Sequence, residues 1–162
     1  MPPPGQRLSF FADAWQKAGA DPALQSLVRE GHKICFGEDG PPPVTLPSLE
    51  YETRLSEDKM SVIREEVSTL GEKVAVREIS WEYATQVPGH YSQIFAVPKP
   101  NGKWRVVINM KPLNEFVLNE KFHMETSRDA RGLLKPENFG AVVDLTDAYY
   151  TVKLHDDSRK YC

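Results

Sequence analysis

A turn sequence between two runs of strand-forming residues constrains this chain more than any other feature. Lys99-Pro-Asn-Gly-Lys103 contains Asn101-Gly102, a pair that tolerates the positive backbone dihedrals of a tight turn. The flanking runs, Gln93 to Val97 and Trp104 to Ile108, are rich in β-branched and aromatic residues. The sequence therefore predicts a β-hairpin over residues 93–110, with its first strand at 93–97.

The N-terminal part of the chain is predicted to be helical. Its apolar residues recur at helical spacing: Leu8, Phe11, Ala12, Trp15 and Ala18. Asp21 is expected to cap a second short helix that ends at Gly31, and residues 32–36 alternate like a short strand. A Gly/Pro-rich stretch follows. We therefore divide this part into a helical leader, residues 1–36, and a linker, residues 37–55.

Residues 56–162 are predicted to mix helices and strands. Ser56 is expected to cap a helix that ends at Gly71 and buries a stripe formed by Met60, Ile63, Val67 and Leu70. Residues 74–79 are predicted to be extended, residues 125–134 helical, and residues 136–140 a loop. The apolar run Ala141 to Leu145 is predicted to be a buried strand. The expected fold class is α+β.

Charge is distributed unevenly, although the net charge is only −3. Residues 1–94 carry nine basic and 14 acidic residues, whereas residues 95–162 carry 11 basic and nine acidic residues. The basic residues thus favour the half that contains the hairpin. Ordinary solvated surface charge explains a difference of this size equally well.

Lys99 and Arg105 are candidate phosphate ligands. They precede and follow the predicted turn, and a hairpin fixes their separation. Arg105 offers a planar fork suited to phosphate oxygens. The alternative is that both are simply exposed hairpin charges.

Asp144 is a candidate metal ligand. It follows three apolar residues, and an aspartate at the end of a buried strand needs a partner. That partner is a metal ion, an N-cap interaction or a salt bridge, and the sequence does not choose between them. Asp147, Ala148 and Tyr149 follow on a turn that can offer backbone N–H groups and an aromatic ring to a nucleotide, or simply contribute a cap and core packing.

Together, and in order, these motifs resemble the reverse transcriptase family, in particular the retrotransposon type. The matching residues are Phe95-Ala-Val-Pro-Lys-Pro-Asn-Gly-Lys-Trp-Arg-Val-Val-Ile-Asn-Met-Lys-Pro-Leu-Asn114, Met124-Glu-Thr126 and Asp144-Leu-Thr-Asp-Ala-Tyr149. The resemblance covers residues 56–162 and implies polymerase fingers and the first part of a palm, with an incomplete palm sheet. The leader looks like that of DIRS-like retrotransposons, on the looser basis of an aromatic helix and a Pro-rich connection.

The resemblance implies a role for each candidate. Asp144, assisted by the backbone carbonyl of Leu145, would bind catalytic Mg²⁺. Lys99 and Arg105 would contact the triphosphate of a deoxynucleotide (dNTP), Asp147 and Ala148 would add backbone N–H groups, and Tyr149 would act as a steric gate against a 2′-hydroxyl. An RNA or DNA template-primer and dNTP are the implied partners.

The sequence also departs from the family pattern. Asn109 replaces the usual aspartate, and the Tyr-x-Asp-Asp segment that carries the remaining catalytic carboxylates does not occur in the 162 residues. We therefore expect a truncated reverse transcriptase domain that is inactive alone. The alternative is a non-catalytic module, derived from a retroelement, that binds nucleic acid or protein through Lys99, Lys103, Arg105 and Lys111.

The cysteine count and the hydropathy of the chain indicate the compartment in which the protein is expected to reside. The two cysteines, Cys35 and Cys162, do not make a disulfide framework, and no apolar run approaches the length of a membrane span. We expect an intracellular protein, nuclear or cytoplasmic, without a membrane partner.

Overall fold

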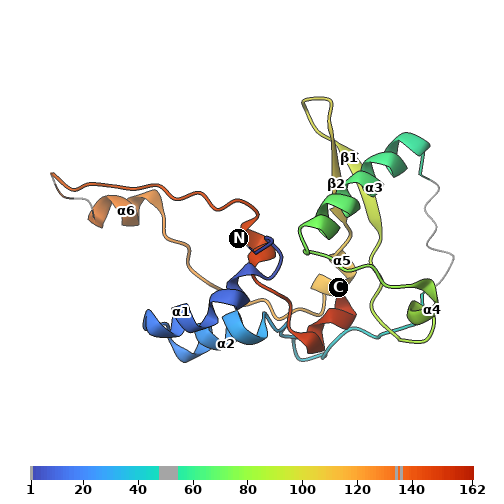
Figure 1. The fold of residues 1–162 in the computed structure, drawn as a ribbon, viewed down its shortest axis with the longest axis horizontal. Helices are drawn as coiled ribbons and strands as arrows, with labels where there is room; N and C mark the ends of the chain where they lie inside the picture. Colours follow the sequence, from blue (N-terminus) through green and yellow to red (C-terminus); the bar gives the residue numbers. More distant parts are fainter. Residues whose placement is uncertain (1, 48–54, 134, 136) are drawn as a thin grey trace.

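The computed structural model of this chain describes residues 2–47, 55–133, 135 and 137–162 (Figure 1). It combines helices with one two-stranded antiparallel sheet, which confirms the α+β class. The elements in chain order are η1 (Arg7–Phe11), α1 (Ala12–Lys17), α2 (Pro22–Glu30), α3 (Glu57–Glu72), α4 (Trp81–Ala84), β1 (Ile94–Pro98), β2 (Trp104–Ile108), α5 (Lys111–Asn114), α6 (Ser127–Leu133), η3 (Ala148–Thr151) and η4 (Asp156–Tyr161).

The chain is extended rather than closed around one core. Its accessible surface is 13409 Å², whereas a compact monomer of this mass would expose about 8,200 Å². The buried apolar residues are few and spread over several elements: Ala12, Val28, Ile63, Ala84, Ala96, Leu113 and Tyr161. An arrangement of this kind is consistent with a partial domain.

The predicted hairpin is confirmed. Strands β1 and β2 pair in antiparallel register from Ile94↔Ile108 to Pro98↔Trp104. Helix α3 lies alongside them (Figure 1) and buries Ile63. Burial along the predicted apolar stripe of α3 is uneven, because Val67 remains 43% exposed.

The leader forms the predicted helices. Asp21 caps α2 by accepting a hydrogen bond from the backbone N–H of Leu24 at 2.9 Å, and Gly31 follows the last residue. A 3-10 helix, η1, precedes α1, so the first predicted helix is divided in two. The predicted strand at residues 32–36 is reduced to isolated bridges, because His32 pairs with Leu154 and Phe36 with Val117, two segments that form no common sheet.

Helix α3 ends one residue later than predicted. Gly71 remains helical, and Val74 takes the left-handed conformation, with φ 56°. The N–H of Val74 donates to the carbonyl of Gly71 and that of Ala75 to Leu70, which is a Schellman cap. A β-branched residue is unusual at this position. Residues 74–76 form a turn and bends, so the stretch predicted to be extended at 74–79 does not begin at Val74, and residues 77–79 belong to no strand.

The predicted buried strand at residues 141–145 is also wrong. The segment is irregular, and Val142 and Val143 are 97% and 81% exposed. A strand needs a neighbour for its backbone groups and its apolar face, and the described residues supply none here. The preceding helix is α6, which is shorter than the predicted 125–134; residues 134 and 136, included in the predicted helix and loop, lie outside the described residues.

Within the described part of the chain, no helix has both the length and the apolar character needed to cross a bilayer.

Candidate functional site

The two faces of the β1–β2 hairpin differ in chemistry. Side chains alternate along a strand, and Arg105 lies opposite Val97, so Lys99, Lys103 and Arg105 share one face. Trp104 and the buried Ala96 belong to the other face. There the ammonium of Lys59, on α3, lies 5.4 Å from the centroid of the Trp104 ring. The basic face, defined as Lys99, Lys103 and Arg105, therefore points away from α3.

The turn that holds these cations is a three-residue loop. The N–H of Gly102 donates to the carbonyl of Lys99 at 3.1 Å, and the N–H of Lys99 donates to the carbonyl of Lys103 at 2.6 Å. Only Gly102 has a positive φ, 75°, so Asn101 does not share the left-handed conformation that the sequence suggested. Asn101 instead accepts a hydrogen bond from the Lys103 N–H through its side chain, at 3.2 Å. The loop is therefore of the type-I-plus-bulge kind.

Asp144 lies in the exposed irregular segment described above, together with Leu145, which is 67% exposed. Figure 1 shows the orange-red segment that follows α6 running along the left of the view, apart from the β1–β2 hairpin. The structure thus does not bring Asp144 to Lys99 and Arg105. No group of three or more His, Cys, Asp or Glu side chains suited to a metal ion occurs among the described residues. Magnesium binding by Asp144 therefore stays a prediction, and it would require further carboxylates beside it.

Asp147 is held by an ion pair. Its carboxylate, 18% exposed, lies 2.9 Å from the ammonium of Lys73 at the end of α3. The hydrogen bond to Asp147 raises the pKa of Lys73 and so favours the charged ammonium. Ala148 opens η3 and is half-buried, whereas the side chain of Tyr149 is 98% exposed. The ring of Tyr149 is thus accessible to solvent.

The predicted site residues fall into separate groups. Lys99 and Arg105 share the hairpin face, and Asp147, Ala148 and Tyr149 share a turn at the start of η3. The roles assigned to them stay predictions.

Sequence reasoning missed Lys73 as the partner of Asp147. The two residues are 74 positions apart, and nothing around Lys73 in the sequence marks it as an acidic-group partner. It also missed the contacts that the leader makes with residues 150–161. Only the three-dimensional arrangement reveals these residues.

A shallow cleft of about 410 Å³ lies elsewhere, between the leader and η4. Its walls include Lys33, Phe36, Asp156, Lys160 and Tyr161. None of the predicted site residues lines it, so it adds no argument for them.

Three curated proteins show what the chain is similar to. It is 25% identical over 108 residues to the Gag-Pol polyprotein of bovine immunodeficiency virus (strain R29), covering 66% of this chain and 7% of that protein. It is 25% identical over 107 residues to the Pol polyproteins of caprine arthritis encephalitis virus (strain Cork) and ovine maedi visna related virus (strain South Africa). Each of these covers 66% of this chain and 9% of the viral protein. No protein-family model matches the chain.

These similarities relate the chain to retroelement polyproteins. The chain spans less than a tenth of the length of the curated relatives it matches. Any activity of those large proteins can therefore only be proposed for this chain.

Proposed function

We propose that this chain is the fingers and first palm portion of an RNA-directed DNA polymerase of a retroelement, of DIRS-like or related type. In this proposal the basic face of the β1–β2 hairpin contacts the triphosphate of an incoming deoxynucleotide. One observation carries it: three cations, Lys99, Lys103 and Arg105, share a hairpin face whose opposite face packs against α3. The similarity to Pol polyproteins supports it.

The physical basis is that triphosphate binding needs cations in a fixed arrangement. The guanidinium of Arg105 presents parallel N–H donors to phosphate oxygens, and the lysines act as point charges. The paired strands hold the backbones of these residues in register, so only their side chains have to be ordered at the moment of binding. The loop hydrogen bonds fix the distance between the two ends of the basic face.

The remaining family roles are further parts of the proposal. They comprise magnesium binding by Asp144 and the donation of backbone N–H groups to the nucleotide by Asp147 and Ala148. They also include selection of deoxyribose by Tyr149 and binding of an RNA or DNA template-primer. Asp144 needs additional carboxylates to hold magnesium and a strand partner to bring its segment into a sheet. We therefore derive no catalytic step for the chain as it stands.

The test is the binding of a fluorescent deoxynucleoside triphosphate, measured by anisotropy with the full chain. Replacing Lys99 and Arg105 by alanine is expected to weaken binding by roughly tenfold or more, because two charge-assisted contacts are lost. Lys17→Ala, on α1 and outside the hairpin, is the matched control and is expected to bind like the wild type. Equal binding by the double variant and the wild type would refute the proposal.

A second function uses the same basic face to bind the backbone of a nucleic acid without catalysis. The grouping of Lys99, Lys103 and Arg105, followed by Lys111 at the start of α5, favours it. Affinity would then fall steeply with salt through counterion release. An oligonucleotide that binds in a salt-dependent way, and is not displaced by free triphosphate, would favour this second function over the first.

A further inference from the structure

Three segments far apart in sequence meet where α3 ends. The N–H of Gly5 donates to the carbonyl of Lys73 at 2.7 Å, and the N–H of Gln6 donates to the carbonyl of Tyr150 at 2.8 Å. The ammonium of Lys73 pairs with Asp147 at 2.9 Å. Figure 1 shows the N-terminus beside the red segment that contains η3. We call this the three-segment junction: residues 5–6, 73–74 and 147–150.

Several residues of this junction have left-handed backbone conformations, which are strained for residues other than glycine. Among the described residues, non-glycine residues with positive φ are Gln6 (61°), Val74 (56°), Glu137 (72°) and Asp147 (57°). Three of these four lie in the junction, one in each segment. Left-handed conformations cost free energy for L-residues, so they persist where surrounding contacts over-determine them. The contacts between the three segments therefore set the conformation of the Asp147–Tyr150 turn.

The fit at Gly5 is close. A Cβ at this position would overlap the carbonyl oxygen of Val74 and lie 2.6 Å from the carbonyl oxygen of Lys73. Both neighbours are backbone atoms, which do not move aside as a flexible side chain does. Any side chain at residue 5 must therefore separate the leader from the end of α3.

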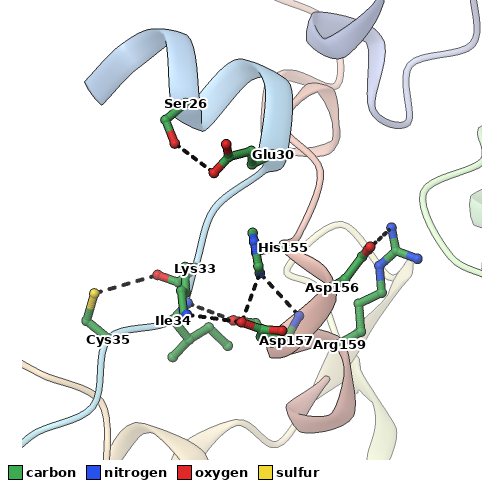
Figure 2. Close-up of polar contacts among 10 residues, drawn as sticks. Ser26, Glu30, Lys33, Ile34, Cys35, His155, Asp156, Asp157 and Arg159 are labelled. Atoms are coloured by element: carbon green, nitrogen blue, oxygen red, sulfur yellow. Dashed lines mark hydrogen bonds and ion pairs between the residues drawn. The ribbon is translucent and has the colours of Figure 1, made fainter. Parts of the chain in front are cut away.

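The leader makes a second series of contacts with the same C-terminal stretch. The N–H of His32 donates to the carbonyl of Lys153 at 2.8 Å, and the N–H of His155 donates back to His32 at 2.9 Å. The N–H of Ile34 donates at 2.9 Å to the hydroxyl of Ser158, a residue only 2% exposed. Figure 2 shows this region, with Lys33 reaching Asp157. The leader thus follows residues 150–161 along their length.

We propose that the leader is a positioning element for the Asp147–Tyr150 turn, acting through Gly5, Gln6 and Lys73. Gly5 and Gln6 join the end of α3 to the turn, and Lys73 fixes the carboxylate of Asp147. Residues 32–36 hold the stretch that follows. The proposal concerns the conformation of the turn, and it stands whether or not the turn contacts a nucleotide.

The test is hydrogen exchange with mass spectrometry on the full 162-residue chain. Gly5→Ala is expected to accelerate exchange in peptides covering residues 147–155 by roughly tenfold, while peptides covering the β1–β2 hairpin remain unchanged. Gly71→Ala adds the same methyl group in α3, where no atom apart from the chain neighbours and the adjacent backbone of the helix lies within 4 Å of the added Cβ, and is the matched control. Unchanged exchange at 147–155 in Gly5→Ala would overturn the proposal.

A second pair of variants covers the case in which Gly5→Ala unfolds the hairpin as well. Lys73→Met is expected to accelerate exchange at 147–155, and Lys73→Arg, which keeps the charge and the donors, to restore slow exchange. A purely steric role for residue 73 would not separate these two variants. Equal exchange in both, or an effect of Lys73→Met that extends to the hairpin, would overturn the proposal.

Discussion

The ring of Phe36 meets the ring of Tyr161 edge to face, with 4.9 Å between their centroids. This contact joins the end of the leader to η4, 125 positions further along the chain. Tyr161 is only 7% exposed. The two rings therefore form an apolar contact between the leader and the C-terminal stretch.

Removal of this ring is expected to be costly. Tyr161→Ala should lower the free energy of unfolding by about 3 kcal/mol, because a buried aromatic side chain is lost. Tyr149→Ala makes the same chemical change at a ring that is 98% exposed and should change it by less than about 0.5 kcal/mol. Urea denaturation followed by circular dichroism measures both. Equal effects of the two substitutions would show that the Phe36–Tyr161 contact does not contribute to stability.

Val74→Gly is expected to stabilise the chain. Val74 has φ 56° at the end of α3 and is 45% exposed, so glycine relieves backbone strain and removes little buried surface. The expected gain is about 0.5–1 kcal/mol, after the extra conformational entropy of glycine in the unfolded chain is taken into account. The measurement is the thermal midpoint. A lower midpoint in the variant would contradict a strained left-handed Val74.

The Lys33–Asp157 ion pair is expected to make stability depend on acid pH. The hydrogen bond and charge of Lys33 lower the pKa of Asp157 below its ordinary value near 3.8. Because the folded-state pKa is depressed, the stabilisation is present above that ordinary value and is lost as the pH falls through the folded-state pKa. The pair is largely exposed, so salt should weaken the effect.

The corresponding measurement compares the thermal midpoint of the wild type and Asp157→Asn between pH 7 and pH 3. The difference between them should shrink as Asp157 becomes protonated in the wild type. Lys33→Gln should reduce the same pH dependence. If the difference is constant over this range, the ion pair does not perturb the titration of Asp157.

We expect no polymerase activity from the chain alone. Two divalent ions about 4 Å apart repel each other by roughly 17 kcal/mol at an effective dielectric constant of 20, so such sites use several carboxylates. Asp144 is a single carboxylate in an exposed segment. The measurement is primer extension with the purified chain. Extension that Asp144→Asn abolishes would contradict this expectation.

Local sequence signals predicted the elements that depend on local chemistry. The hairpin follows from strand-forming runs around a glycine turn, and α2 follows from the Asp21 cap and Gly31. The grouping of Lys99 and Arg105 on one face follows from the register of that hairpin. Each of these features depends on residues that are close together in the sequence, so the rules of alternation and helix capping suffice to predict it.

Features that depend on distant partners were not predictable. The run Ala141 to Leu145 has strand propensity, but a strand also needs neighbours, and the structure leaves this run exposed. Similarly, neither Lys73 nor Asp147 signals its partner in the sequence, and the left-handed Val74 contradicts local preference. In each case tertiary contacts, or their lack, overrode the local pattern.

Photo-crosslinking with an azido-deoxyadenosine triphosphate, mapped by mass spectrometry on the full chain, tests most directly whether the hairpin binds a nucleotide. The proposed function predicts labelling of peptides that cover residues 93–110, suppressed by unlabelled triphosphate and by replacing Lys99 and Arg105 with alanine. Labelling confined to other parts of the chain, or labelling of the hairpin that unlabelled triphosphate does not suppress, would contradict it.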